Sequence, residues 1–184
     1  PPDNSNMQTP PDGNAPSGNP PTMPGQDAAD STTTDDTTDK QPVLLITGGK
    51  ITVNADGDGL DSNGDLRVEG GDITINGPSN GGNGALDIGT ENGGGTLIAL
   101  GTSSMTENFG STSTQCAFLV TMNSFGAGET ITITDSQGTV LYTGVTVKSA
   151  NSVVFSSADL VVGETYTVTI GSSSATVTQS STVV

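Results

Sequence analysis

The chain contains no histidine and no tryptophan, and it has a single cysteine, Cys116. Without histidine it lacks the commonest general base and the commonest transition-metal ligand of proteins. One cysteine cannot form a disulfide within the chain. Because Cys116 begins an apolar run, we interpret it as a small core residue rather than a nucleophile. These absences argue against the most frequent kinds of catalytic centre.

Positive charge is almost as scarce. The 184 residues include 20 carboxylates and only four lysines and arginines, which gives a formal net charge of −16. Such a surface repels nucleic acid and anionic membranes, and it attracts divalent cations. No apolar stretch reaches the roughly 20 residues that a membrane-spanning helix needs. We therefore expect neither a nucleic-acid partner nor membrane insertion.

Proline is nearly confined to one end of the chain, because residues 1–42 hold all ten prolines except Pro78. The rest of this segment is rich in Asp, Asn, Thr and Gly. A segment of this composition buries no core of its own and is expected to be an extended tail. The run STTTDDTTD within it is a candidate for O-linked sugar, at Thr32, Thr33, Thr34, Thr37 and Thr38.

A repeat begins directly after the tail. LITGGKITVNADGDGLDSNGD starts at residue 45, LRVEGGDITINGPSNGGNGALDIG starts at residue 66, and GGGTLIALG echoes them from residue 93. Each unit has a Gly-Gly corner, a short alternating apolar strand and, in the first two, a turn rich in Asn, Asp and Gly. A period of roughly 20–25 residues with these features is typical of stacked solenoids. We predict a short parallel β-helix of about three rungs over residues 43–105.

The interior of such a narrow solenoid should be filled by aliphatic side chains. The candidates are Leu44, Ile46, Ile51, Val53, Leu60, Leu66, Val68, Ile73, Ile75, Leu86, Ile88 and Leu97.

The period changes after a polar connector at residues 106–115. Short alternating strands occupy residues 116–184, separated by turns such as residues 135–138, and this spacing predicts a small antiparallel β-sandwich. Leu160, Gly163 and Tyr166 precede one of these strands in a pattern that resembles the tyrosine corner of immunoglobulin-like and fibronectin type III domains. We interpret Tyr166 as a structural residue whose hydroxyl bonds to the backbone upstream. The expected fold class is therefore all-β throughout.

The sequence DGDGLDSNGD, from Asp56 to Asp65, is the strongest candidate for a metal site. Carboxylates so close together repel one another unless a cation lies among them, and Ca²⁺ accepts six to eight oxygen ligands in irregular geometry. Aligning GDGLD with GNGALD stacks Asp61 over Asp87 on neighbouring rungs. The alternative is a set of turns in which Asp side chains accept hydrogen bonds from backbone N–H groups. The candidate Ca²⁺ ligands are Asp56, Asp58, Asp61, Asn63, Asn83 and Asp87.

Sequence support for catalysis is weak. A polysaccharide lyase uses a basic residue beside its calcium, and within the predicted β-helix only Lys50 and Arg67 are basic. A lyase-like enzyme is accordingly a distant third hypothesis. For sugar binding, the chain offers only Tyr142 and Tyr166 as amphipathic aromatic platforms.

Residues 42–171 resemble the bacterial calcium-binding, β-helical carbohydrate-binding-domain family of clostridial type, which binds cellulose and pectin. The segments ITGGKITVNADGDGLDSNGD, ITINGPSNGGNGALD and GGTLIALG carry the resemblance. It implies export, a right-handed parallel β-helix, bound Ca²⁺ and affinity for acidic polysaccharide, with the Asp-rich turn at residues 56–61 as a source of ligands. This chain departs from the family upstream, where its proline-rich tail stands in place of further rungs.

These features lead to two hypotheses about function. In the first, the protein is a non-enzymatic extracellular structural protein, a subunit of a calcium-stabilised fibre. Copies of the chain would assemble head to tail by donating the N-terminal tail as a strand to the next copy. In the alternative, it is a calcium-dependent carbohydrate-binding module of a bacterial surface protein, with acidic polysaccharide or cellulose as ligand. Both hypotheses place it at the bacterial cell surface or outside the cell.

Overall fold

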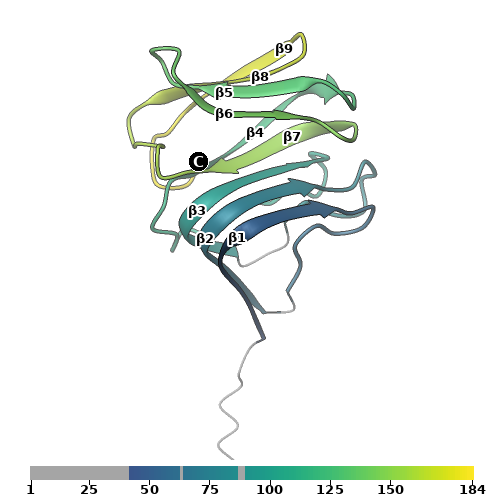
Figure 1. Cartoon of the computed structure of the whole chain (residues 1–184), viewed down its shortest axis with the longest axis vertical. Helices are drawn as coiled ribbons and strands as arrows, with labels where there is room; N and C mark the ends of the chain where they lie inside the picture. The colour runs from purple at the N-terminus through teal and green to yellow at the C-terminus, as the bar shows by residue number, and fades with distance from the viewer. Residues whose placement is uncertain (1–41, 63, 87–89) are drawn as a thin grey trace, which may run out of the picture. The chain divides into compact units, whose positions relative to one another are not determined.

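The computed structural model describes residues 42–62, 64–86 and 90–184, and the fold of these residues is all-β (Figure 1). They form a five-stranded sheet of order β1-β2-β3-β7-β4 and a four-stranded sheet of order β6-β5-β8-β9. Thr38–Val184 makes up one compact unit, whereas the other, Pro1–Thr37, lies outside the described residues. The strands are β1 (Val43–Asn54), β2 (Asp65–Asn76), β3 (Thr90–Gly101), β4 (Ala117–Phe125), β5 (Thr130–Thr134), β6 (Val140–Val145), β7 (Ala150–Ser156), β8 (Thr165–Ile170) and β9 (Ser173–Thr178).

The three repeat units supply the three parallel strands of the larger sheet. Strand β1 pairs with β2 and β2 with β3, so that Ile51, Ile73 and Leu97 lie side by side in one row. Each strand is interrupted by a register shift at its Gly-Gly pair, where the repeat predicted a corner. The second glycine of each pair has a positive φ, of 93° at Gly49, 105° at Gly71 and 83° at Gly95. Residues with a Cβ rarely adopt such a backbone, which explains why the corners are glycine.

The parallel strands continue directly into antiparallel ones. Strand β3 pairs antiparallel with β7, and β7 pairs antiparallel with β4, so one sheet contains both arrangements. The predicted connector, residues 106–115, therefore joins two strands of the same sheet rather than two separate layers. The division into residues 43–105 and 116–184 stays a prediction about which parts fold independently.

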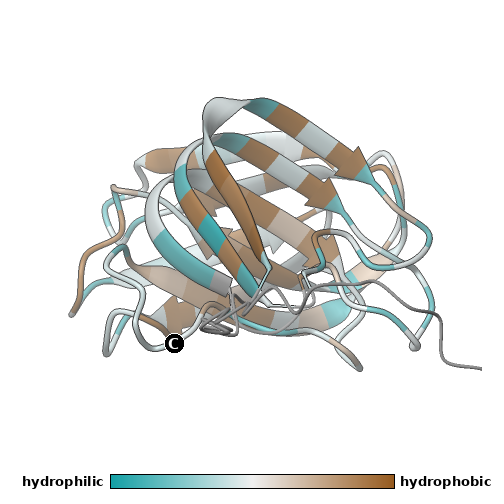
Figure 2. Ribbon diagram, turned by 90° about the horizontal axis from the view of Figure 1, so that it is seen from below, coloured by the Kyte–Doolittle hydropathy of each residue, from teal (hydrophilic) through white to brown (hydrophobic). Residues whose placement is uncertain are grey.

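At β3, both faces of the larger sheet are buried, because neighbouring residues along this strand enter different cores. In β3, Leu97 and Ala99 belong to a core covered by the loops between the parallel strands, whereas Ile98 and Leu100 belong to a core shared with the smaller sheet. The strands accordingly carry alternating hydrophobic and hydrophilic bands (Figure 2). Period-two alternation of this kind is what assigns each strand its two faces.

The smaller sheet ends in the predicted tyrosine corner. The backbone N–H of Val161 donates a hydrogen bond of 2.7 Å to the hydroxyl oxygen of Tyr166. The Tyr166 side chain is 1% exposed and its ring stacks on Phe118 of the facing sheet at 6.2 Å between centroids. The structural interpretation of Tyr166 is confirmed. The predicted turn at residues 135–138 is also present, joining β5 to β6.

The predicted interior is largely confirmed, with one error. The buried core on the loop side contains eight of the twelve aliphatic candidates, and Ile51 and Val53 pack against it. Leu44 was predicted to point inward but is 37% exposed, because β1 is an edge strand and nothing in the described residues covers its outer side. Ile88 lies outside the described residues. The eight buried candidates are Ile46, Leu60, Leu66, Val68, Ile73, Ile75, Leu86 and Leu97.

The two edges of the five-stranded sheet differ. At the β4 edge, the backbone N–H groups of Ala117 and Leu119 donate to the carbonyls of Thr182 and Val184, each at 2.8 Å, so the C-terminal segment covers that edge. At the β1 edge, Val43 and Leu45 are about half exposed, and no described strand pairs there. An uncovered edge is a template for a further strand.

Among the described residues, no helix is long and apolar enough to cross a membrane.

Candidate functional site

The two Asp- and Asn-rich turns lie side by side, as the repeat predicted. The backbone N–H of Gly59 donates to the carbonyl of Gly84 at 3.0 Å, and Leu60 forms a parallel bridge with Leu86. This register agrees with the alignment of GDGLD with GNGALD. The contact is close enough that a Cβ on Gly59 would come within 2.3 Å of the Ala85 carbonyl oxygen, so the sequence needs glycine there.

The acidic side chains of these turns already have protein partners. The Asp56 carboxylate accepts a hydrogen bond of 2.7 Å from the Lys148 ammonium group, which holds the pKa of Asp56 below its ordinary value. The carboxylate of Asp58 accepts a 2.8 Å hydrogen bond from the backbone N–H of Gly84, and the Asn83 amide donates to the Asn80 side-chain oxygen at 3.4 Å. The Asp58 contact is the kind expected from the alternative to a metal site, in which Asp side chains of the turns accept hydrogen bonds from backbone N–H groups.

The described part of the turns forms no complete set of Ca²⁺ ligands. Within the described residues, no group of three or more acidic, histidine or cysteine side chains is arranged to hold a metal ion. Asp61 is exposed on its turn. The predicted ligands Asn63 and Asp87 lie outside the described residues, as do the candidate glycosylation sites at Thr32, Thr33, Thr34, Thr37 and Thr38. The calcium site therefore stays a prediction.

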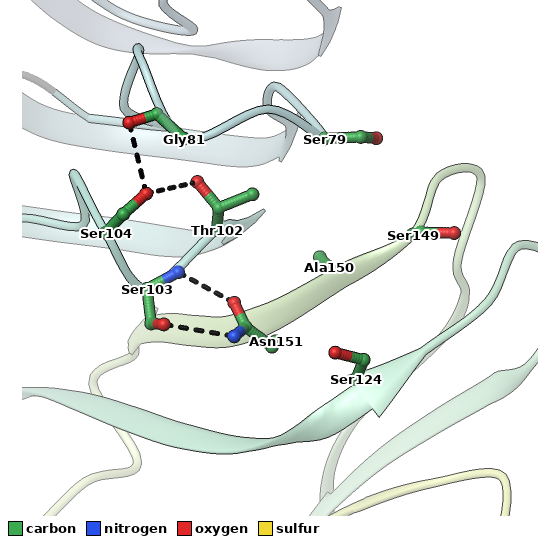
Figure 3. A pocket seen from close by; sticks show the side chains of 9 residues that line it. All are labelled: Ser79, Gly81, Thr102, Ser103, Ser104, Ser124, Ser149, Ala150 and Asn151. Atoms are coloured by element: carbon green, nitrogen blue, oxygen red, sulfur yellow. Dashed lines mark hydrogen bonds between the residues drawn. The ribbon is translucent and has the colours of Figure 1, made fainter.

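A cavity of about 310 Å³ lies beside these turns, where β3 and β4 end and β7 begins (Figure 3). No charged side chain lines it. We call it the serine cavity, because five of its nine residues are serines. Its lining residues are Ser79, Gly81, Thr102, Ser103, Ser104, Ser124, Ser149, Ala150 and Asn151.

One side of the serine cavity is fixed by hydrogen bonds between its own residues. The backbone N–H of Ser103 donates to the side-chain oxygen of Asn151 at 2.7 Å, and the Asn151 amide donates to the Ser103 hydroxyl at 3.0 Å. The hydroxyl of Ser104 donates to the carbonyl of Gly81 at 3.2 Å, which connects the loop after β3 to the turn after β2 (Figure 3). These contacts hold the polar groups in place before any ligand arrives.

Three other hydroxyls of the serine cavity are unused. Those of Ser79, Ser124 and Ser149 have no hydrogen-bond partner among the described residues. A hydroxyl is both donor and acceptor, so these groups suit a ligand that is itself rich in hydroxyls. Sequence reasoning missed all nine residues, since single serines scattered over four loops and strand ends form no pattern along the chain.

A second cavity, of about 270 Å³, contains one of the aromatic residues that the sequence singled out. We call it the tyrosine cavity, because Tyr142 of β6 forms part of its wall. Lys50 also lines it, although no sequence feature indicated a cleft around this residue. The other lining residues are Asp72, Ile73, Thr74, Thr96 and Thr143.

Arg67 lies at a different, smaller cavity of about 140 Å³. Its guanidinium group is paired with the carboxylates of Asp65 at 3.3 Å and Glu91 at 3.6 Å, all three side chains being well exposed. Lys50 and Arg67, the two basic residues considered for a lyase-like mechanism, therefore line different cavities.

Residues 18–179 match the model of a family described as carbohydrate-binding domain-containing protein. This is most of the chain, and the protein belongs to that family. No curated protein matches the chain, and no solved structure matches it either.

Proposed function

We propose that this protein is a non-catalytic carbohydrate-binding module whose ligand is a polysaccharide and whose binding site is the serine cavity. The observation that carries the proposal is a cavity lined by neutral hydroxyl and amide groups in a chain that belongs to a carbohydrate-binding family. The volume, about 310 Å³, is at the small end of the range for ligand pockets, roughly 300–1,000 Å³. That size suits one or two sugar rings of a longer chain.

The hydrogen-bonding groups of the cavity fit sugar hydroxyls. A sugar hydroxyl that leaves water needs a donor and an acceptor in exchange, and serine, threonine and asparagine side chains provide both. The Ser103–Asn151 pair keeps one wall in a fixed geometry, so little ordering entropy is lost when a ligand binds. The remaining hydroxyls, on Ser79, Ser124 and Ser149, have no hydrogen-bond partner among the described residues, so no such bond has to break when a ligand binds.

Charge favours a neutral polysaccharide at this site. The chain carries a net charge of −16, so an anionic polymer meets repulsion that only bridging cations or salt would reduce. The serine cavity itself contributes no charge of either sign. Calcium-bridged binding of an acidic polysaccharide by the Asp56–Asp87 turns is the alternative, and it predicts binding that is lost in excess chelator.

The test compares two double variants of the full chain. Ser124→Ala with Ser149→Ala removes two unused hydroxyls, whereas Ser172→Ala with Ser180→Ala removes two exposed serines far from the cavity in sequence. Affinity electrophoresis and titration calorimetry against neutral glucans, xylans and mannans, and against polygalacturonate with Ca²⁺ or EDTA, should show at least tenfold weaker binding for the first variant only. Equal binding by both variants, or no binding to any polysaccharide by the native chain, would overturn the proposal.

We infer further that the parallel part of the fold is a short β-helix of about three rungs, and that β4–β9 form an immunoglobulin-like sandwich on it. The inference is supported by the stacked rows of β1, β2 and β3, by the glycine corners and by the Leu60–Leu86 bridge on another side of the coil. It implies a rigid platform, whose strand ends position the loops of the serine cavity. A polysaccharide ligand also accords with a location at the bacterial surface.

The fibre subunit remains a second hypothesis, and one feature favours it. The outer edge of β1 is unpaired among the described strands, and the side chains of Val43, Leu44 and Leu45 on this strand are exposed. A strand from another copy would pair with the backbone of this edge, and its side chains would cover part of these residues on the two faces. The proposed donor, residues 1–42, lies almost wholly outside the described residues, so deletion of this segment is the direct test of the hypothesis.

A further inference from the structure

The tyrosine cavity is formed where the face of the parallel strands extends past the edge of the smaller sheet. Lys50, Asp72 and Thr96 form one row across β1, β2 and β3, and Thr74 lies next to this row on the same face. Tyr142 and Thr143 come from β6, one of the two edge strands of the four-stranded sheet. The cavity thus has a polar floor from the larger sheet and an aromatic wall from the smaller one.

The floor has charge but no internal ion pair. Lys50 and Asp72 are both exposed, they occupy paired positions on neighbouring strands, and no ion pair within 4.0 Å involves either of them among the described residues. Their ammonium and carboxylate groups therefore remain available as a strong donor and a strong acceptor on neighbouring strands. The hydroxyls of Thr74 and Thr96 beside them have no described hydrogen bond either.

Tyr142 is only partly buried by the core. It pairs with Ile133 in the β5–β6 ladder, so its side chain points to the inner face of the sheet, where the ring lies 5.9 Å from that of Phe155. Gly144 makes room for this placement, because a Cβ there would come within 2.7 Å of the Tyr142 hydroxyl oxygen. A glycine within a strand often marks such a close approach. The remaining surface of the tyrosine side chain lines the cavity.

We propose that the tyrosine cavity is a second carbohydrate subsite, which takes a neutral pyranose ring of the polysaccharide. This proposal rests on the proposed function and adds a separate site to it. The apolar C–H groups of a pyranose pack against an aromatic side chain, which gives Tyr142 a role that serine and threonine cannot fill. The Asp72 carboxylate accepts hydrogen bonds from sugar hydroxyls, and the Lys50 ammonium group donates to sugar oxygens.

The charge of the cavity selects against acidic sugars. A uronate would gain attraction from Lys50 but would meet the Asp72 carboxylate on the adjacent strand, within a chain of net charge −16. A neutral sugar incurs no such repulsion and uses both charged groups as hydrogen-bond partners. The tyrosine cavity and the serine cavity therefore favour the same class of polymer.

The first experiment uses paired variants that leave the net charge unchanged. Lys50→Met with Asp72→Asn removes the two charges of the tyrosine cavity, and Arg67→Met with Asp65→Asn removes an exposed ion pair elsewhere on the same sheet. We expect the first variant to bind the neutral oligosaccharide identified for the native chain at least tenfold more weakly, with unchanged thermal unfolding. The Arg67 and Asp65 variant should bind like the native chain.

The second experiment observes Tyr142 directly. The chain has no tryptophan and only two tyrosines, so a Tyr166→Phe background leaves Tyr142 as the one tyrosine fluorophore. Saturation with the same oligosaccharide should change the tyrosine fluorescence in this background, and the change should disappear when Lys50→Met and Asp72→Asn are added.

The outcomes separate the two proposals. In one outcome, sugar binding depends on Ser124 and Ser149, while the Lys50→Met and Asp72→Asn variant binds like the native chain and the fluorescence of Tyr142 does not change. In that case the proposal of a second subsite is wrong and the proposed function stands. If binding depends on the tyrosine cavity alone, the tyrosine cavity is the sugar-binding site and the assignment of the serine cavity is wrong. If no neutral oligosaccharide binds the native chain, both proposals fail.

Discussion

Lys148 and Asp56 form an ion pair of 2.7 Å between their ammonium and carboxylate groups, and the same ammonium donates to the carbonyl of Ala55 at 2.5 Å. Lys148 lies in the loop between β6 and β7, whereas Ala55 and Asp56 come directly after β1. The contact therefore ties the loop that connects the two sheets to the first Asp-rich turn. It also places a cation on one of the carboxylates that the sequence assigned to Ca²⁺.

This ion pair predicts a specific pH dependence. The hydrogen bond from Lys148 and its positive charge lower the pKa of Asp56 below the ordinary value of 3.8, so the pair stabilises the fold above that pH and the contribution is lost as the pH falls through the lowered pKa. The melting temperature of Lys148→Met should differ more from that of the native chain near neutral pH than in acid, where the ion pair is lost and only the hydrogen bond to the Ala55 carbonyl still distinguishes the two. The effect should be small because the Asp56 side chain is fully exposed. Lys50→Met, which removes no described ion pair, should show no such pH-dependent difference from the native chain.

Calcium binding is predicted to raise the melting temperature by mass action. Melts in millimolar Ca²⁺ and in excess EDTA should differ for the native chain, and the difference should shrink in Asp58→Asn and Asp61→Asn but persist in Asp159→Asn. If Ca²⁺ binds Asp56, it competes with the Lys148 ammonium group, so the calcium-dependent shift should be larger in Lys148→Met. Superimposed melts with and without calcium would contradict the prediction.

Replacing Tyr166 with phenylalanine should reduce the free energy of unfolding by about 1 kcal/mol or somewhat more. The change removes the acceptor of the Val161 N–H hydrogen bond and leaves the buried ring in place. Urea titration measures the loss. Sugar affinity should be unchanged, and a variant with native stability but weakened binding would reverse this assignment of Tyr166.

The glycine corners allow a graded comparison of alanine substitutions. Gly48 has no positive φ and open space around it, so Gly48→Ala should be nearly neutral. Gly49→Ala has space but requires a positive φ, which costs about 1–3 kcal/mol. Gly71→Ala has the same backbone strain, and its Cβ would also lie 2.8 Å from the Gly49 carbonyl oxygen. Denaturant melts should rank the losses in that order, and an equal effect at all three sites would be inconsistent with the corner geometry.

Deletion of residues 1–42 tests the fibre hypothesis. If the segment donates a strand to the β1 edge of another copy, the deleted chain should stay folded and monomeric while the intact chain forms filaments. Electron microscopy and sedimentation, each with and without Ca²⁺, measure the two states. Filaments that persist after the deletion, or an intact chain that stays monomeric at high concentration, would contradict the hypothesis.

The repeat and the alternation of apolar residues were enough to predict much of the fold. The Gly-Gly pairs mark backbone positions that few residues besides glycine adopt, and the apolar positions after them repeat in the same order, so the stacking of Ile51, Ile73 and Leu97 was readable in advance. The tyrosine corner was predicted for a similar reason, since its hydrogen bond spans only five residues. Local patterns of this kind are set by backbone geometry and by period.

Only the tertiary structure decided how the parts meet. That β3 pairs with β7 could not be read from either strand, because each is a short run of consecutive apolar residues buried on both faces, and such strands pair with many partners. The exposure of Leu44 results from β1 being an edge, which is a property of the sheet rather than of the segment.

Some candidate sites could be read from the sequence, and others are formed only by the tertiary structure. The sequence by itself identified the acidic turns and their mutual register, because those residues are contiguous and repeated. The serine cavity and the tyrosine cavity gather residues from segments between Lys50 and Asn151, each of them ordinary where it stands in the chain. A cavity lined by single side chains from distant segments exists only after strand pairing has joined β3 to β7 and packing has brought the smaller sheet against them, and neither can be read from local sequence.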